Sequence, residues 1–215
     1  MGNTFSGNPY YTDIGATETD DGYTIVTAGI SGAGKTVAML NRIEYFSNCE
    51  NTTTVVFCKH EYEYKEFIDK NNVFIVDYKH AYENNLGIHD IIDKQQNINN
   101  EVLVVIDTSV YYSDDYLLKL WIDCKNNNYI VNITSMDISG FPIKIVDTAA
   151  MYEIFNHTRL MSNNKHMLKL IGLNYLMHRI DINILNRGEK LLLDNGEYVL
   201  LKEQKREKRC LAREI

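Results

Sequence analysis

The chain has 215 residues, which is enough for one domain of ordinary size with additional arms. Hydrophobic residues make up 45% and charged residues 24%, which excludes a mainly disordered chain, a collagen-like fibre and a disulfide-stapled miniprotein. The net charge of -7 means that the surface as a whole repels nucleic acid, so contact with nucleic acid would need a local basic patch. Four scattered cysteines without a CxxC pair indicate thiols in a reducing compartment, not a zinc site.

Residues 1–20 are rich in Gly, Asn, Thr and Asp, and we interpret them as a flexible N-terminal arm. The arm starts Met-Gly-Asn-Thr-Phe-Ser, which fits the N-myristoylation pattern with Gly2 as the acceptor and Ser6 at the required place. An unmodified disordered start is the alternative. One acyl chain holds a membrane only marginally, so membrane contact through Gly2 would need a second signal or a partner. A secretory signal pattern is not seen, so we expect the protein not to be secreted.

The first predicted elements alternate between strand and helix. Residues 23–28 are a short β-rich run that ends at a glycine cluster, and a helix is expected over 35–46. Its apolar stripe is expected at Val37, Leu40, Ile43 and Phe46. Residues 53–58 and 73–76 are predicted strands, and the polar segment 61–69 between them predicts a short helix.

The middle of the chain continues this alternation. Residues 80–96 are predicted to be an amphipathic helix, and the unbroken apolar run 102–106 is typical of a parallel strand covered on both faces. Ser113 is a predicted N-cap, because aspartates follow it in the first turn of a helix that reaches about Cys124.

The last third contains two further predicted strands, 129–133 and 143–146, and a helix over 161–173. Leu-rich and Val-rich runs flank the sequence Asp-Asn-Gly-Glu at 194–197, which predicts a β-hairpin because Asn-Gly tolerates positive φ. Residues 202–215 mix basic and acidic side chains, as expected for a charged tail.

Strands that alternate with helices predict an α/β fold. We expect a three-layer P-loop NTPase domain over residues 21–201, with a mostly parallel central sheet and a C-terminal β-hairpin. The arm 1–20 and the tail 202–215 would lie outside this domain.

The strongest chemical signal is a phosphate-binding loop. Its residues satisfy G-x-x-x-x-G-K-[ST] at every position: Gly29, Ile30, Ser31, Gly32, Ala33, Gly34, Lys35 and Thr36. Glycines let successive amide groups point inward at phosphate oxygens, and the start of the following helix adds its free N–H groups. Lys35 is expected to reach the β- and γ-phosphates, and Thr36 to hold Mg²⁺. The alternative is a glycine-rich turn that binds nothing.

An acid on a nearby strand should complete the metal site. Asp107 follows four apolar residues at the carboxyl end of a predicted strand, where ligands bind in open α/β sheets. We therefore predict Lys35 and Asp107 as the catalytic residues, and Thr36 and Asp107 as ligands of Mg²⁺. Thr134 and Ser135 end the next strand and are candidate sensors of the γ-phosphate. A turn without contact to the nucleotide is the alternative for both.

The order GISGAGKT, TTVVFCK, VLVVIDTS and YIVNITSMDISGFP resembles the poxvirus-type genome-packaging ATPases of large DNA viruses and virophages, within the FtsK–HerA superfamily. The resemblance covers residues 23–155. It implies binding and hydrolysis of ATP with Mg²⁺, and a homo-oligomeric ring that moves double-stranded DNA into a capsid. Partners would then be DNA and capsid proteins, and the location the host cytoplasm, a viral factory or the virion.

Lys35, Thr36 and Asp107 match the motifs of this family, whereas two other positions depart from them. The family usually has a second acid where Thr108 stands and a glutamine near Ser135. Because threonine is a poor base at neutral pH, hydrolysis would be slow, use another acid, or be absent. The alternative function is therefore a nucleotide-binding interaction protein that hydrolyses weakly or not at all, anchored to a membrane through Gly2.

Overall fold

The computed structural model describes residues 23–49, 51–92, 101–107, 113–136, 141–155, 190–194 and 197–201. The strands are β1 (Thr24–Ala28), β2 (Thr52–Cys58), β3 (Val73–Asp77), β4 (Glu101–Asp107), β5 (Ile130–Ser135), β6 (Met151–Phe155), β7 (Lys190–Asp194) and β8 (Glu197–Leu201). The helices are α1 (Lys35–Ser47), the 3₁₀ helix η1 (Glu61–Phe67), α2 (Tyr78–Glu83), α3 (Ile88–Ile92), α4 (Asp114–Asn126) and α5 (Ile143–Thr148). In these ranges, no helix is both long enough and apolar enough to span a membrane.

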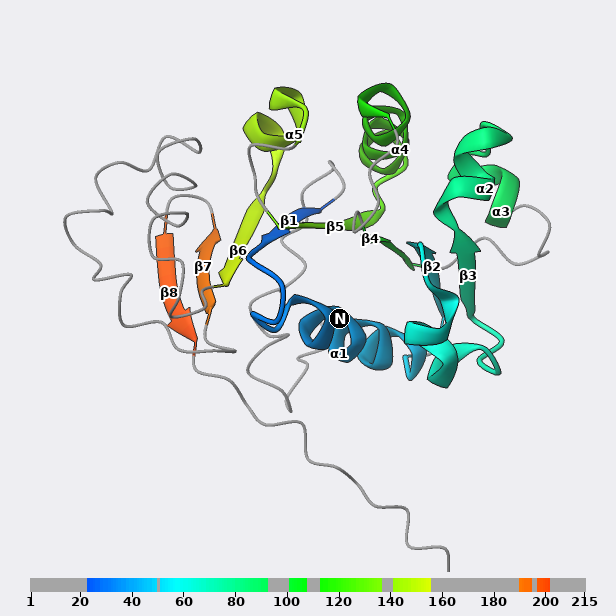
Figure 1. The fold of residues 1–215 in the computed structure, drawn as a ribbon, viewed down its shortest axis with the longest axis horizontal. Helices are drawn as coiled ribbons and strands as arrows, with labels where there is room; N and C mark the ends of the chain where they lie inside the picture. The colour runs from blue at the N-terminus through cyan, green and yellow to red at the C-terminus, as the bar shows by residue number, and fades with distance from the viewer. Residues whose placement is uncertain are drawn as a thin grey trace, which may run out of the picture.

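The strands form one eight-stranded sheet in the order β3-β2-β4-β5-β1-β6-β7-β8. All pairs from β3 to β6 are parallel, and the hairpin β7–β8 adds two antiparallel strands at one edge. Figure 1 shows α1 on one face of the sheet and α2 to α5 on the other. The predicted three-layer α/β fold with a mostly parallel sheet and a C-terminal hairpin is confirmed.

The core has two parts, one on each face of the sheet. β4 contributes to both because successive side chains of a strand point to opposite faces: Val104 and Ile106 pack in the larger cluster, and Leu103 and Val105 in the smaller. This double burial explains the continuous apolar run at 102–106.

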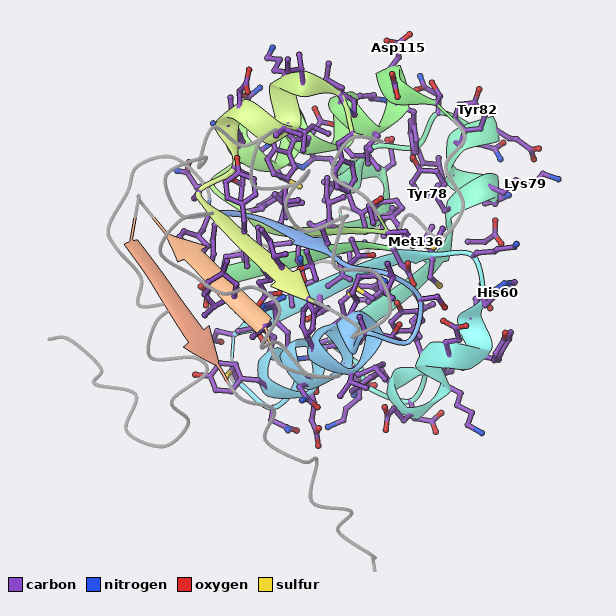
Figure 2. All side chains as sticks on the ribbon, turned by 60° about the vertical axis from the view of Figure 1, so that its left-hand side comes forward. His60, Tyr78, Lys79, Tyr82, Asp115 and Met136 are labelled. Carbon is purple, nitrogen blue, oxygen red and sulfur yellow. The ribbon has the colours of Figure 1, made fainter. Side chains whose placement is uncertain are left out.

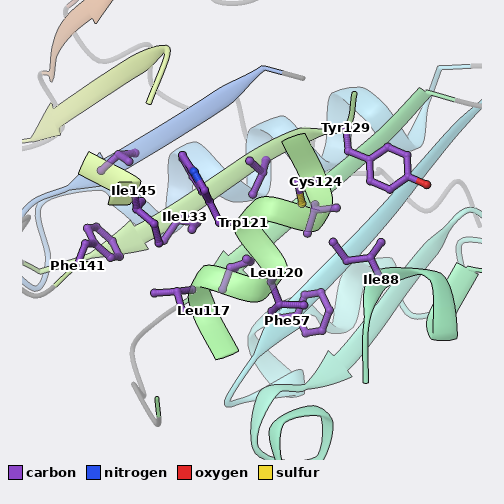
Figure 3. Close-up of a cluster of buried hydrophobic side chains, with 14 of the residues drawn as sticks. Phe57, Ile88, Leu117, Leu120, Trp121, Cys124, Tyr129, Ile133, Phe141 and Ile145 are labelled. Carbon is purple, nitrogen blue, oxygen red and sulfur yellow. The ribbon is translucent and has the colours of Figure 1, made fainter. Parts of the chain in front are cut away.

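Helix α4 covers the sheet on the larger side of the core (Figure 3). Its buried face is made by Tyr116, Leu117, Leu120, Trp121 and Cys124. The indole Nε1 of Trp121 donates a hydrogen bond of 3.2 Å to Thr148 Oγ1 at the end of α5, which ties the two helices together. The helix starts where the sequence predicts, because the Ser113 side chain accepts from the Tyr116 amide.

Segment 143–146 forms the start of α5 and not the predicted strand. Its residues Ile-Lys-Ile-Val have strand-like alternation, but Pro142 occupies the N-cap, where its carbonyl accepts the first helical hydrogen bonds from Ile145 and Val146. The strand that pairs with β1 on the side away from β5 is β6, which the sequence reasoning did not identify.

Two predicted helices also differ in detail. The expected helix 80–96 is split into α2 and α3, because the chain turns at Asn84 and Asn85, with Asn85 at a φ of 52°. In α1, Val37 is 38% exposed whereas Met39 is buried. A stripe spaced by three residues drifts around a helix of 3.6 residues per turn, so only its later members reach the buried face. The predicted arm 1–20, helix 161–173 and tail 202–215 lie outside the described residues.

Candidate functional site

The glycine loop joins β1 to α1 at the carboxyl edge of the sheet. Gly32 and Gly34 adopt φ values of 77° and 113°, a backbone region that disfavours residues with a side chain. A Cβ atom at Gly29 would lie 2.8 Å from Phe155 Cβ, so the close approach of the loop to β6 requires a glycine there. The Gly29 amide donates to the Ser135 carbonyl at 3.2 Å, which fastens the loop to the end of β5.

Lys35 turns its ammonium group back over the loop. Its Nζ donates to the carbonyl oxygens of Gly29 at 2.5 Å and Ile30 at 3.0 Å. Burial lowers the pKa of Lys35 from its usual value, and the negative charge of Asp107 acts in the opposite direction. Thr36 is exposed in the first turn of α1. The predicted phosphate-binding residues therefore form a curved loop, and the ammonium group of Lys35 lies against its first two residues.

Asp107 reaches the same edge from another strand. β5 lies between β1 and β4, and in this sheet Thr134 is in register with both Thr27 and Asp107. The carboxyl ends of the three strands are consequently aligned. The fold brings together Lys35, Asp107, Thr134 and Ser135, whereas Gly2 and Thr108 lie outside the described residues.

Two hydroxyl groups hold the carboxylate of Asp107, which is only 8% exposed. Tyr64 Oη donates to Oδ2 at 2.9 Å, and Thr134 Oγ1 donates to Oδ1 at 3.2 Å. Burial, followed by the charge of Asp107, raises the pKa of Tyr64 well above its usual range. The same causes raise the pKa of Cys58 to about 12, so both neighbours are neutral at pH 7.

The side chain of Thr134 is therefore buried, and its hydroxyl points toward Asp107. Ser135 lies at the end of β5 and is partly exposed. Its carbonyl oxygen accepts the hydrogen bond from the Gly29 amide of the loop. The γ-phosphate contact expected for Thr134 and Ser135 stays a prediction. Tyr64 was missed by the sequence reasoning, because it lies in a polar segment far from the motifs in sequence.

A buried ionic network joins α1 to the sheet. Glu153 on β6 accepts from Arg42 Nη2 at 2.8 Å, Lys190 Nζ at 2.6 Å and Thr27 Oγ1 at 2.8 Å. Asn132 accepts from Arg42 and donates to Thr27 Oγ1 at 2.8 Å. Arg42 belongs to α1 and Lys190 to β7, so the network links the helix after the loop to the hairpin.

Glu153 is ionised in this network. Burial alone would raise its pKa, but the charges of Arg42 and Lys190 and their hydrogen bonds hold the pKa well below the usual range of a glutamate. Sequence reasoning missed the network. A usable signal was present in the arginine at 42, which lies among the apolar residues of α1.

The residues fit a magnesium ion that arrives with a nucleotide. Within the described ranges, no group of three or more His, Cys, Asp or Glu side chains could hold a metal ion by itself. Mg²⁺ in nucleotide sites is typically bound through one or two carboxylates, substrate phosphates and water. Asp107 and the hydroxyl of Thr36 supply the oxygen ligands such an ion prefers.

No protein-family model and no curated protein matches the sequence. Among solved structures, it is similar to the genome-packaging NTPase B204 of Sulfolobus turreted icosahedral virus 2 in complex with AMP: TM-score 0.60, 11% identity, 86% of this chain and 99% of B204 covered. The chain therefore shares the fold of B204.

Two further solved structures share the fold. One is EssC (ATPases 2 and 3) from Geobacillus thermodenitrificans, with a TM-score of 0.55, 12% identity, and coverage of 84% of this chain and 39% of EssC. The other is the pCW3 conjugation coupling protein TcpA with ATPγS, with a TM-score of 0.53, 14% identity, and coverage of 93% of this chain and 63% of TcpA. The expected likeness to genome-packaging ATPases is confirmed for the fold.

Proposed function

We propose that the chain is a Mg²⁺-dependent ATPase that binds the triphosphate in the loop 29–36. The observation that carries this proposal is the alignment of strand ends. The wound loop with Lys35 and the carboxylate of Asp107 lie at one edge of the sheet, near enough for the charge of Asp107 to act on Lys35. A cation beside inward-pointing amides and a carboxylate on the metal side are the parts that phosphoryl transfer requires.

The roles of the residues follow from their chemistry. Amide groups of the loop and of the first turn of α1 would bind phosphate oxygens. Lys35 would exchange its contacts with the loop carbonyls for the β- and γ-phosphates. Thr36 and Asp107 would hold Mg²⁺, which, when bound, offsets the negative charge that builds up on the phosphates. Ser135 and Thr134 would contact the γ-phosphate through their hydroxyl groups.

We further propose that ATP hydrolysis drives packaging of double-stranded DNA into a capsid. Support comes from B204, a genome-packaging NTPase whose chain is covered over 99% of its length, and which has been solved with AMP and with AMPPCP. A homo-oligomeric ring, contact with capsid proteins, and a location in a viral factory or virion belong to the same proposal.

The second candidate is a nucleotide-binding interaction protein with little or no hydrolysis. It is favoured by Thr108, which follows Asp107 where related ATPases usually carry a second acid. A threonine cannot orient water as a base at neutral pH. In this case Gly2 would carry a myristoyl group and contribute to membrane contact, which mass spectrometry of the native N-terminus tests directly.

The deciding experiment measures binding and turnover of Mg-ATP, with and without double-stranded DNA. Wild type should bind Mg-ATP and turn it over faster with DNA, and Lys35→Ala should lose both properties. Lys79→Ala is the matched control, because Lys79 projects outward from α2 with 59% of its side chain exposed (Figure 2). Binding without turnover would support the second candidate, and no binding by the wild type would refute both.

A further inference from the structure

We propose that Tyr64 is a positioning residue, whose hydroxyl orients the carboxylate of Asp107 for the Mg²⁺ that accompanies the nucleotide. This inference rests on the proposed nucleotide-binding function. It concerns a residue outside the loop and strand-end motifs, and it assigns the 3₁₀ helix η1 a part in the site.

The fold brings η1 to the metal side of the site. η1 follows β2, and β2 pairs with β4 so that Phe57 is in register with Ile106, one residue before Asp107. Tyr64 is fully buried, with an exposed fraction of 0%, and its hydroxyl lies 2.9 Å from Asp107 Oδ2. A buried phenol needs a partner for its polar end. Here that partner is the carboxylate.

Tyr64 and Thr134 hold Asp107 from two sides. Thr134 comes from β5 and donates to Oδ1, whereas Tyr64 comes from η1 and donates to Oδ2. The terminal torsion of an aspartate is broad, so one donor leaves the carboxylate plane poorly fixed and two donors on different oxygens define it. Each carboxylate oxygen has about two acceptor sites. One hydroxyl on each oxygen therefore does not by itself use up the acceptor capacity of the carboxylate.

The test compares how much Mg²⁺ improves nucleotide binding in four proteins. Calorimetry would give the affinity for ATP in MgCl₂ and in EDTA, and the ratio of the two affinities is the metal-dependent gain. Tyr64→Phe removes only the hydroxyl. Tyr62→Phe is the matched control, because Tyr62 lies on the same helix and is 67% exposed. Asp107→Asn marks the effect of losing the carboxylate charge.

We expect Tyr64→Phe to lower the metal-dependent gain by roughly tenfold, the lower end of the range for one hydrogen bond to a charged group. Its affinity in EDTA should match that of the wild type, and Tyr62→Phe should match the wild type in both conditions. An unchanged gain in Tyr64→Phe would overturn the inference and leave the proposed function intact. Equal losses in MgCl₂ and EDTA would also overturn it, because they indicate a general structural role. Failure of the wild type to bind ATP at all would instead refute the proposed function.

Discussion

Replacing Glu153 by glutamine removes the carboxylate that two buried cations share. Arg42 is 4% exposed and Lys190 9%, and both bind Glu153 Oε1, at 2.8 Å and 2.6 Å. Breaking a buried ion pair from one side typically costs about 3–5 kcal/mol, because the remaining charge stays desolvated. Because these charged groups are buried, solvent screens them only weakly, and we do not reduce this energetic cost for screening. For a chain of this size we expect the melting temperature to fall by roughly 10 °C.

Urea unfolding followed by circular dichroism measures this loss. Glu83→Gln is the control, because Glu83 is 57% exposed and lies 3.7 Å from Lys79 on the surface of α2. An exposed pair of this kind contributes about 0.5 kcal/mol or less. A Glu153→Gln protein whose unfolding free energy lies within about 1 kcal/mol of the wild type, the cost of an average substitution, would refute the assignment of a strong network.

The same network predicts a pH dependence. The folded-state pKa of Glu153 lies well below its usual value of 4.5, so its contribution to stability is complete above that value. It is lost as the pH falls below 4.5 toward the lower pKa of the folded state. The difference in unfolding free energy between wild type and Glu153→Gln should therefore be constant near pH 7 and shrink in acid. A difference that grows on acidification would contradict this account.

Three further substitutions test the loop and a helix cap. Gly29→Ala should abolish binding of Mg-ATP and cost about 1–3 kcal/mol of stability, because its Cβ would meet Phe155 at 2.8 Å. Gly32→Ala should cost only about 1–2 kcal/mol, since its φ of +77° is strained for alanine but no atom beyond its own residue and its two chain neighbours lies within 4 Å of the added carbon. Ser113→Ala should lower stability by about 0.5–1 kcal/mol in urea unfolding, through loss of the cap on α4; an unchanged midpoint would refute the capping role.

Local signals in the sequence predicted much of the fold. The glycine loop, the apolar run of β4 and the cap at Ser113 each depend on residues that are adjacent in the chain, and each appears where expected. The hairpin is confirmed for the same reason, since β7 and β8 pair with Asp194 opposite Glu197.

The errors arise where distant contacts decide the structure. Segment 143–146 has the alternation of a strand, yet Pro142 starts a helix there. β6 was missed because Glu153 interrupts its apolar pattern, and that glutamate is stable in the core only because Arg42 and Lys190 neutralise it. The place of Tyr64 beside Asp107 depends on the pairing of β2 with β4, which no local pattern reveals.

The chain has a single tryptophan, so its tryptophan fluorescence reports on one location. Trp121 is 1% exposed between α4 and the sheet, and its indole N–H is bonded to the last residue of α5. α5 follows β5 in the chain, and the Ser135 carbonyl at the end of β5 accepts a hydrogen bond from Gly29 of the glycine loop. A rearrangement at that edge which displaced α5 would change the surroundings of the indole, so unlabelled protein carries an optical sensor for such motion.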